Sequence, residues 1–318
     1  MCGDQFLNVP ASKGGSAGSD EPIGLIAGEG ELPILVAEGI KRSGCTVHTV
    51  GLAGCFDERL PGYCDTFQSA GILRIGRWAR ILRRHGVTRA VMIGRVRKQR
   101  MYDPLRLIRQ IPDRRAVSIW FHKLRHDHRT SALLAAVADS LAEMGITLMD
   151  STEYIQDQLA TQGVMTRNSP DAAQLADIAF GWPLLISALE HDFGQAMSVC
   201  DRDVIAVEAI EGTDSMIERT GQLCRRKGWV LLKGAKLKHD RRADVPTIGE
   251  TTVRKVHQCG GRCIALAAGD VIIVNKPSVL KLADKLGVSI TGIAGGNETE
   301  LPAASGTREQ SEQAATDQ

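Results

Sequence analysis

The sequence predicts an α/β protein with two domains, an N-terminal Rossmann-like unit and a distinct C-terminal α/β domain. Three observations lead to this prediction. Short apolar segments of strand length alternate with longer helical patterns, which is typical of mostly parallel sheets covered by helices. The length of 318 residues suits two domains of ordinary size. The segment Ala160–Pro170 (ATQGVMTRNSP) has the Gly, Asn and Pro of a short connector.

The first domain is expected over residues 21–160, after a polar, Gly/Ser-rich leader at 1–20 that we expect to be disordered. It opens with an apolar strand at Ile23–Ala27, a glycine turn and a helix at Leu32–Ser43. Further strands are expected at Thr46–Leu52, Arg89–Ile93 and Ile146–Asp150, and helices at Arg77–His85, Thr130–Met144 and Thr152–Leu159.

The second domain is expected over residues 161–295, before a polar tail at 296–318 that we also expect to be disordered. Helix Asp171–His191 opens this domain. Strands are expected at Ala196–Val199, Val204–Ala209, Trp229–Leu232, Ile264–Leu266 and Val271–Val274, and helices at Ser215–Lys227, Thr251–Gln258 and Ser278–Leu286.

Composition narrows the classes of function. The 39 basic and 37 acidic residues leave a net charge of +2, which gives no general attraction to nucleic acid. The eight cysteines lack the spacing of a zinc site and are typical of thiols in a reducing compartment. The N-terminus is too polar for a signal peptide, and no apolar run reaches the roughly 18 residues of a membrane span, so a cytoplasmic location is expected.

The turn after the first strand reads Gly28-Glu29-Gly30-Glu31-Leu32-Pro33. Backbone amides and the helix dipole at such a turn can hold an anion or a polar ligand. The dinucleotide fingerprint needs a third glycine and an acidic residue after the second strand. Pro33 takes the place of that glycine and the second strand ends without an acid, which disfavours a nicotinamide oxidoreductase. A tight turn without any ligand remains open.

An acidic segment follows the strand expected at Val204–Ala209 and contains Glu208, Glu211 and Asp214. Ligand sites gather at the carboxyl ends of strands in α/β folds, and carboxylates there can bind Mg²⁺. Asp214 has the residue type of a helix N-cap, but Ser215 and Glu218 have the spacing of a capping box. We therefore expect Ser215 to cap the helix, Asp214 to face the cleft, and Asp214 and Glu211 to bind Mg²⁺. Glu208 and Glu211 are more open to a structural or solvated role.

A basic loop follows the next strand, which ends at Lys233, and the loop carries Lys236, Lys238, Arg241 and Arg242. Cations at such a position can neutralise phosphate oxygens. A solvated basic loop is the alternative. A phosphate ligand with a metal ion needs both cations and carboxylates, and the two loops together would supply them.

Five segments in this order resemble the UDP-2,3-diacylglucosamine pyrophosphatase family: IGLIAGEGELP, GVMTRNSP, DFGQA, VEAIEGTDSMIER and KxxKxxxDRRADVPTIGxxT. The resemblance runs from about Ile23 to Ile293. It implies Mg²⁺-assisted hydrolysis of UDP-2,3-diacylglucosamine to UMP and 2,3-diacylglucosamine 1-phosphate, and it places the catalytic acidic residue of the family at Asp214. The loop from Lys233 to Asp240 departs from the family, because it lacks the usual prolines and glutamine.

We therefore expect Asp214 and Lys233 to be catalytic. Substrate contacts are expected at Gly28, Gly30, Leu32, Pro33, Gly94, Gln195, Thr213, Lys236, Asp240 and Arg241. The expected partners are the lipid substrate and, transiently and peripherally, the inner membrane, through basic residues between Arg95 and Arg129; a homo-oligomer is left open. A non-catalytic nucleotide-sugar or lipid-binding protein is the alternative. His122, His126 and His128 suit either a metal site or the protein surface.

Overall fold

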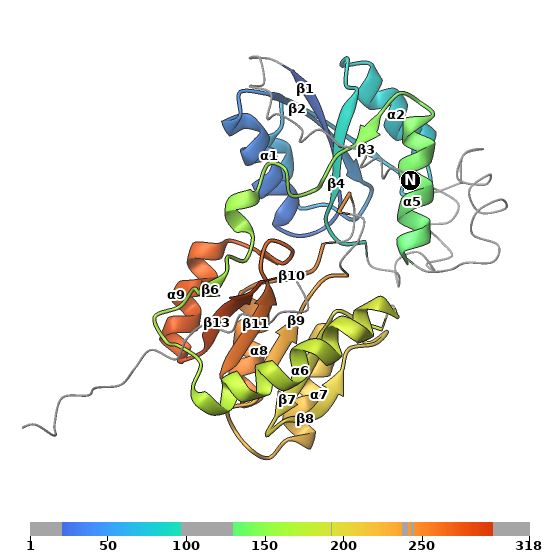
Figure 1. Cartoon of the computed structure of the whole chain (residues 1–318). Helices are drawn as coiled ribbons and strands as arrows, with labels where there is room; N and C mark the ends of the chain where they lie inside the picture. The colour runs from blue at the N-terminus through green and yellow to red at the C-terminus, as the bar shows by residue number, and fades with distance from the viewer. Residues whose placement is uncertain (1–20, 97–129, 192, 237–240, 243–244, 295–318) are drawn as a thin grey trace, which may run out of the picture.

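The computed structural model describes residues 21–96, 130–191, 193–236, 241–242 and 245–294. Figure 1 shows two sheets, one in each half of the chain, with β10 near their junction. The first sheet is parallel and the second is mixed, so the predicted α/β class with two domains is confirmed. The seven cysteines that the structure describes form no disulfide.

The N-terminal sheet has the strand order β3-β2-β1-β4-β5, and all its pairings are parallel. Helix α1 lies on one face, whereas α2 and α5 lie on the other (Figure 1). Strand β1 is buried on both faces because both are covered, which explains its unbroken apolar sequence. Its elements are β1 (Pro22–Ala27), α1 (Leu32–Arg42), β2 (Thr46–Leu52), η1 (Leu60–Tyr63), β3 (Thr66–Ala70), α2 (Ile75–Arg83), β4 (Arg89–Ile93), α5 (Thr130–Ala142) and β5 (Thr147–Leu148).

The C-terminal sheet has the order β6-β13-β11-β9-β7-β8. Strands β9, β11 and β13 are parallel, and β7 runs antiparallel to both β9 and β8. The carboxyl ends of β8, β9, β11 and β13 therefore share one edge with the start of β7. The elements are β6 (Gly163–Val164), α6 (Ala172–Glu190), β7 (Ala196–Cys200), β8 (Asp203–Val207), α7 (Thr213–Leu223), β9 (Val230–Lys233), α8 (Glu250–Gln258), β11 (Cys263–Ala267), α9 (Lys276–Leu286) and β13 (Ser289–Ile293).

A small parallel sheet of β10 (Thr247–Ile248) and β12 (Ile272–Ile273) joins the domains. Ile272 is fully buried in a core cluster whose other buried members all come from the N-terminal domain. It also pairs with Leu159 at the end of that domain. The two domains thus share a continuous apolar contact beside the connector.

Four strands, β3, β6, β10 and β13, were not predicted. Strand β13 (SITGI) is wholly buried, but its Ser, Thr and Gly hide the apolar signal. Gly292 is required there, because a Cβ would lie 1.9 Å from the carbonyl oxygen of Thr161. The predicted strand Val271–Val274 shortens to β12.

The predicted helix Thr152–Leu159 is wrong. The segment forms turns and a single 3₁₀ turn, η3, at Gln156–Gln158. The Asp150 carboxylate accepts hydrogen bonds from the amide and hydroxyl of Thr152, at 2.8 and 2.7 Å, which favours a turn over a helix. The Tyr154 carbonyl also packs where a side chain on Gly39 would stand.

Helix α6 is the one helix within the described residues that is long and apolar enough to cross a membrane by length and composition alone. Asp171 and Gln174 form a capping box at its start, and Pro183 lies inside it. Its buried residues Ile178, Trp182 and Leu185 belong to the C-terminal core cluster. We therefore interpret α6 as the core helix of that domain.

Candidate functional site

The strand register places Lys233 beside the start of α7. Along β9, Leu231 and Lys233 lie on one face of the sheet, since side chains alternate. Leu231 pairs with Ser198, whose hydroxyl contacts Thr220 of α7 at 2.8 Å. Lys233 is only 4% exposed, and its Nζ donates a hydrogen bond to Thr213 Oγ1 at 2.6 Å. The sheet thus brings the expected Lys233 and Thr213 together.

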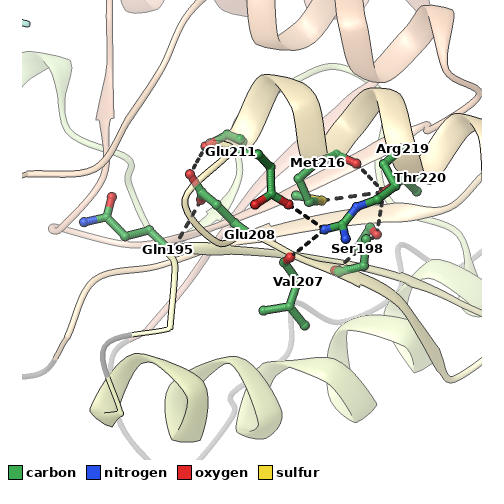
Figure 2. A network of polar contacts seen from close by, with 10 residues as sticks. Gln195, Ser198, Val207, Glu208, Glu211, Met216, Arg219 and Thr220 are labelled. Atoms are coloured by element: carbon green, nitrogen blue, oxygen red, sulfur yellow. Dashed lines mark hydrogen bonds and ion pairs between the residues drawn. The ribbon is translucent and has the colours of Figure 1, made fainter. Parts of the chain in front are cut away.

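Glu208, directly after β8, is the centre of a polar network at the same edge (Figure 2). Its Oε1 accepts a hydrogen bond from the Thr213 hydroxyl at 2.9 Å, and its Oε2 accepts one from the backbone N–H of Gln195 at 3.2 Å. Gly194 allows this close approach, because a Cβ there would lie 2.2 Å from the Glu208 carbonyl oxygen. Sequence reasoning assigned Glu208 no specific role, since only the antiparallel pairing of β7 with β8 brings Gln195 to it.

Helix α7 begins without a side-chain cap. Its N-cap residue is Gly212, with a φ of 82° that favours glycine. The amides of Thr213, Asp214 and Ser215 precede the first helical hydrogen bond and have no backbone acceptor within the described residues. Three amides at a helix N-terminus beside a lysine ammonium form a favourable environment for a phosphate group.

The predicted capping box is wrong. Ser215 lies in the first turn of α7, because the positive φ of Gly212 turns the chain into the helix earlier than the Ser215–Glu218 pattern indicates. Asp214 is therefore inside the helix, with a half-exposed side chain 3.5 Å from Lys255 Nζ. Lys255 also contacts Glu218, and the hydrogen bond to Glu218 and the charge of Asp214 raise the pKa of Lys255.

Glu211 forms an ion pair with Arg219, at 2.7 Å, and the same guanidinium group donates to the Val207 carbonyl oxygen at 2.9 Å (Figure 2). The two expected Mg²⁺ ligands, Glu211 and Asp214, thus each lie against a cation. In the part of the chain that the structure describes, no three Asp, Glu, His or Cys side chains form a metal-binding cluster. The histidines at 122, 126 and 128 lie outside that part.

In the N-terminal domain, the glycine turn packs against the end of β4. A Cβ on Gly28 would lie 2.7 Å from the Gly94 backbone, and a Cβ on Gly94 would lie 2.7 Å from that of Gly28. Gly94 and Gly30 also have positive φ values of 107° and 104°. At the start of α1, Pro33 is buried and Leu32 packs at the margin of the core. Ligand contact by these residues stays a prediction.

Arg241 lies between the domains. Its Nη1 donates to Asp270 at 2.9 Å and its Nη2 donates to Thr152 Oγ1 at 2.9 Å. The Asp150 carboxylate lies 2.8 Å from Nε, as an ion pair rather than an aligned hydrogen bond. Asp150 follows β5 and Asp270 follows β11, so the carboxyl edges of both sheets meet at this junction. Lys236 is half-buried in the same loop, and Asp240 lies outside the described residues.

The fold is that of a two-domain α/β protein, and the edge at the strand ends brings together a lysine and a helix start, a set of groups that suits an anion. A family model described as the LpxI N-terminal domain matches residues 22–158, and one described as the LpxI C-terminal domain matches residues 161–291. The chain belongs to the LpxI family. It is 28% identical over 279 residues to the UDP-2,3-diacylglucosamine pyrophosphatase LpxI of Caulobacter vibrioides, covering 85% of this chain and 97% of that relative.

Proposed function

We propose that this chain hydrolyses the pyrophosphate bond of UDP-2,3-diacylglucosamine and releases UMP and 2,3-diacylglucosamine 1-phosphate. Family membership and the name of the Caulobacter relative support this substrate. The observation that carries the proposal is the buried Lys233 beside the uncapped start of α7. A pyrophosphate is a doubly charged group whose oxygens suit an ammonium and a set of backbone amides.

In the proposed mechanism, this chain's donors act on the oxygens that gain charge as the bond breaks. The Lys233 ammonium carries a full positive charge and three N–H donors, and its hydrogen bond to Thr213 holds it beside the start of α7. The amides of Thr213, Asp214 and Ser215 are held in place by the helix and need no reorganisation. Fixed donors of this kind stabilise the transition state more than mobile ones.

Mg²⁺ is part of the proposal, with Asp214 as the carboxylate that would hold it. Mg²⁺ commonly takes one or two protein carboxylates, with substrate phosphates and water as its other ligands. A half-exposed Asp214 beside the phosphate-binding amides fits that pattern. The ion would screen the pyrophosphate charge and activate water. Glu211 would first have to leave Arg219.

Release of UMP from UDP-2,3-diacylglucosamine by the purified chain tests the reaction. We expect turnover with Mg²⁺, loss of turnover in excess chelator, and recovery when Mg²⁺ is restored. Full rate in the chelator would remove the metal from the mechanism. Tight binding of substrate without UMP release, with or without metal, would favour the alternative of a non-catalytic binding protein.

The basic segment predicted to touch the membrane lies mostly outside the described residues, which leave out 97–129. We further propose that the protein acts in the cytoplasm and that α2 also visits an anionic membrane surface. This helix and its C-cap residue expose Arg77, Arg80, Arg83 and Arg84, and no ion pair to them occurs among the described residues. Like charges three or four positions apart oppose helix stability. A hollow of about 380 Å³ lies there, lined by Gly76, Ala79, Arg80, Arg83, Arg84 and Met144. Arginines around a partly apolar floor suit a lipid phosphate.

A further inference from the structure

The Glu208 carboxylate is linked to Lys233 through one intervening residue, Thr213. Both carboxylate oxygens accept a hydrogen bond, one from the Thr213 hydroxyl and one from the backbone N–H of Gln195. The Thr213 oxygen in turn accepts the hydrogen bond from Lys233 Nζ. A continuous path of 2.9 and 2.6 Å hydrogen bonds therefore links the carboxylate to the ammonium.

We propose that Glu208 is a positioning residue for the proposed hydrolysis: acting through Thr213, it holds the Lys233 ammonium at the phosphate-binding edge. This inference rests on the proposed function. Within the described residues, the hydrogen bonds of the Glu208 carboxylate go to Thr213 and Gln195, and the proposed effect on the phosphate is exerted through Thr213. It determines which way the intervening hydroxyl points, and so where the ammonium is held.

The direction of the hydrogen bonds gives Glu208 this role. A threonine hydroxyl has one proton to donate. Because a carboxylate can only accept, Thr213 donates that proton to Glu208 and turns a lone pair toward Lys233. Glu208 faces two donors, the backbone N–H of Gln195 and the hydroxyl of Thr213, and its carboxylate offers one acceptor oxygen to each. A glutamine has a single acceptor oxygen, so it satisfies only one of the two donors.

The backbone leaves Glu208 little room to move. Its amide donates to the Ala196 carbonyl oxygen at 2.8 Å, and the Gly234 amide donates to the Gln195 carbonyl oxygen at 3.0 Å. Gly194 packs directly on the Glu208 carbonyl group. Strands β7, β8 and β9 thus fix the carboxylate relative to Lys233. A nearly buried ammonium gains from an anion at this fixed distance, because the low local dielectric strengthens the interaction.

The test compares Glu208→Gln, Thr213→Val and Thr213→Ser with a control, Glu190→Gln. Glu190 is exposed at the end of α6 and loses the same charge in the same domain. We expect Glu208→Gln and Thr213→Val to lower kcat by roughly tenfold to a hundredfold, the range for a lost buried hydrogen bond to a charged group. KM should change much less. Thr213→Ser keeps the hydroxyl and should restore most of kcat.

A double variant tests whether the two residues act as one path. Adding Glu208→Gln to Thr213→Val should lower kcat by no more than about twofold further, because the path is already cut. If the two substitutions lower kcat independently, so that their fold-changes multiply in the double variant, the proposal is overturned. A wild-type kcat in Glu208→Gln, with melting unchanged, would also overturn it.

A measurement without substrate separates this inference from the proposed reaction. NMR of the lysine ammonium groups should show slowed hydrogen exchange at Lys233 in the wild type and in Glu190→Gln, and faster exchange in Glu208→Gln. Unchanged exchange in Glu208→Gln overturns the positioning role even if the enzyme is active. If Glu208→Gln changes the exchange at Lys233 but the wild-type chain never releases UMP, the positioning role of Glu208 stands and the proposed reaction is refuted.

Discussion

At the scale of single residues, Lys233 shows why a lysine can lie at the end of a buried strand. A buried ammonium is costly unless it is hydrogen-bonded and near an anion. Lys233 has Thr213 at 2.6 Å, with Glu208 directly behind it. An arrangement of this cost is more easily explained by ligand binding than by stability, since an apolar residue would fill the position without it.

Replacing Lys233 with alanine is expected to lower kcat more than it raises KM. Loss of a cation aimed at oxygens that gain charge typically costs about 3 kcal/mol, or roughly a hundredfold in rate. Steady-state kinetics with UDP-2,3-diacylglucosamine, with thermal melting alongside, give the measurement. Lys285→Ala, on the exposed side of α9, is the control. If only KM rises, the lysine binds ground state and transition state equally.

Asp214→Asn is expected to abolish turnover while leaving melting nearly unchanged. The side chain is half exposed, and its ion pair with Lys255 belongs to a class of surface pairs that contribute little to stability. Glu218→Gln is a matched control, because Glu218 contacts the same lysine. Full activity in Asp214→Asn would exclude this carboxylate from the reaction and from metal binding.

Among the secondary-structure elements, glycines determine the backbone at two places, the start of α7 and the turn between β1 and α1. Gly212 lets α7 begin with three amides that have no backbone acceptor within the described residues, and the Ser198–Thr220 contact fixes the helix on the sheet (Figure 2). In the other domain, Gly28 and Gly94 let the turn after β1 rest on the end of β4. Both arrangements stand at the carboxyl ends of strands, where ligands of α/β proteins bind.

Gly94→Ala is expected to destabilise the protein by about 2–4 kcal/mol, since it combines backbone strain with overpacking. Its φ is +107°, and the new Cβ would lie 2.7 Å from the Gly28 carbonyl carbon. Urea unfolding measures the effect. Gly62→Ala is the control, because nothing lies within 4 Å of that position. Equal stability of the two variants would contradict the close packing of Gly28 and Gly94.

The arginine face of α2 is expected to bind anionic vesicles. Each basic residue near such a surface contributes about 1 kcal/mol, so Arg80→Glu with Arg83→Glu should weaken co-sedimentation roughly tenfold or more. Lys281→Glu with Lys285→Glu changes the charge equally on exposed positions of α9. Equal losses in both pairs would mean that only net charge matters. Binding to neutral vesicles alone would refute the arginine face.

At the scale of the whole molecule, the domains are joined by more than the connector. Ile272 completes the core of the N-terminal domain, and Arg241 spans Asp150 and Asp270. These contacts hold the carboxyl edges of the two sheets toward each other. Contact of the proposed substrate with the glycine turn on one side and Lys233 on the other stays a prediction of this arrangement.

Arg241→Ala is expected to lower melting temperature and turnover together, with a loss of about 1–3 kcal/mol typical of a broken polar network. Calorimetry should then resolve looser coupling of the two domains. Arg254→Ala removes an exposed pair with Glu250 within one helix and should have little effect. If turnover is lost while the melting temperature is unchanged, the result would instead support the sequence-based prediction that Arg241 contacts the substrate phosphate.

Local sequence patterns were enough to predict the α/β class, most helices and strands, and the loops that carry the candidate site. Periodicity and turn residues are local signals, and Lys233, Thr213 and Asp214 stand out by their places after apolar strands. The start of α7 was misjudged because a glycine with positive φ leaves no side-chain signature. Strands as short as β10, or as polar as β13, leave little pattern either.

Which of these residues come into contact depends on how the chain folds as a whole. Gln195, Glu208, Thr213 and Lys233 come from four separate segments, and they form one network because β7 pairs antiparallel with both β8 and β9. Arg241 belongs to a loop that reads as a phosphate-binding segment, yet it contacts Asp150 across the domain junction. Strand order, register and domain contact are long-range properties, and no local pattern of residues encodes them.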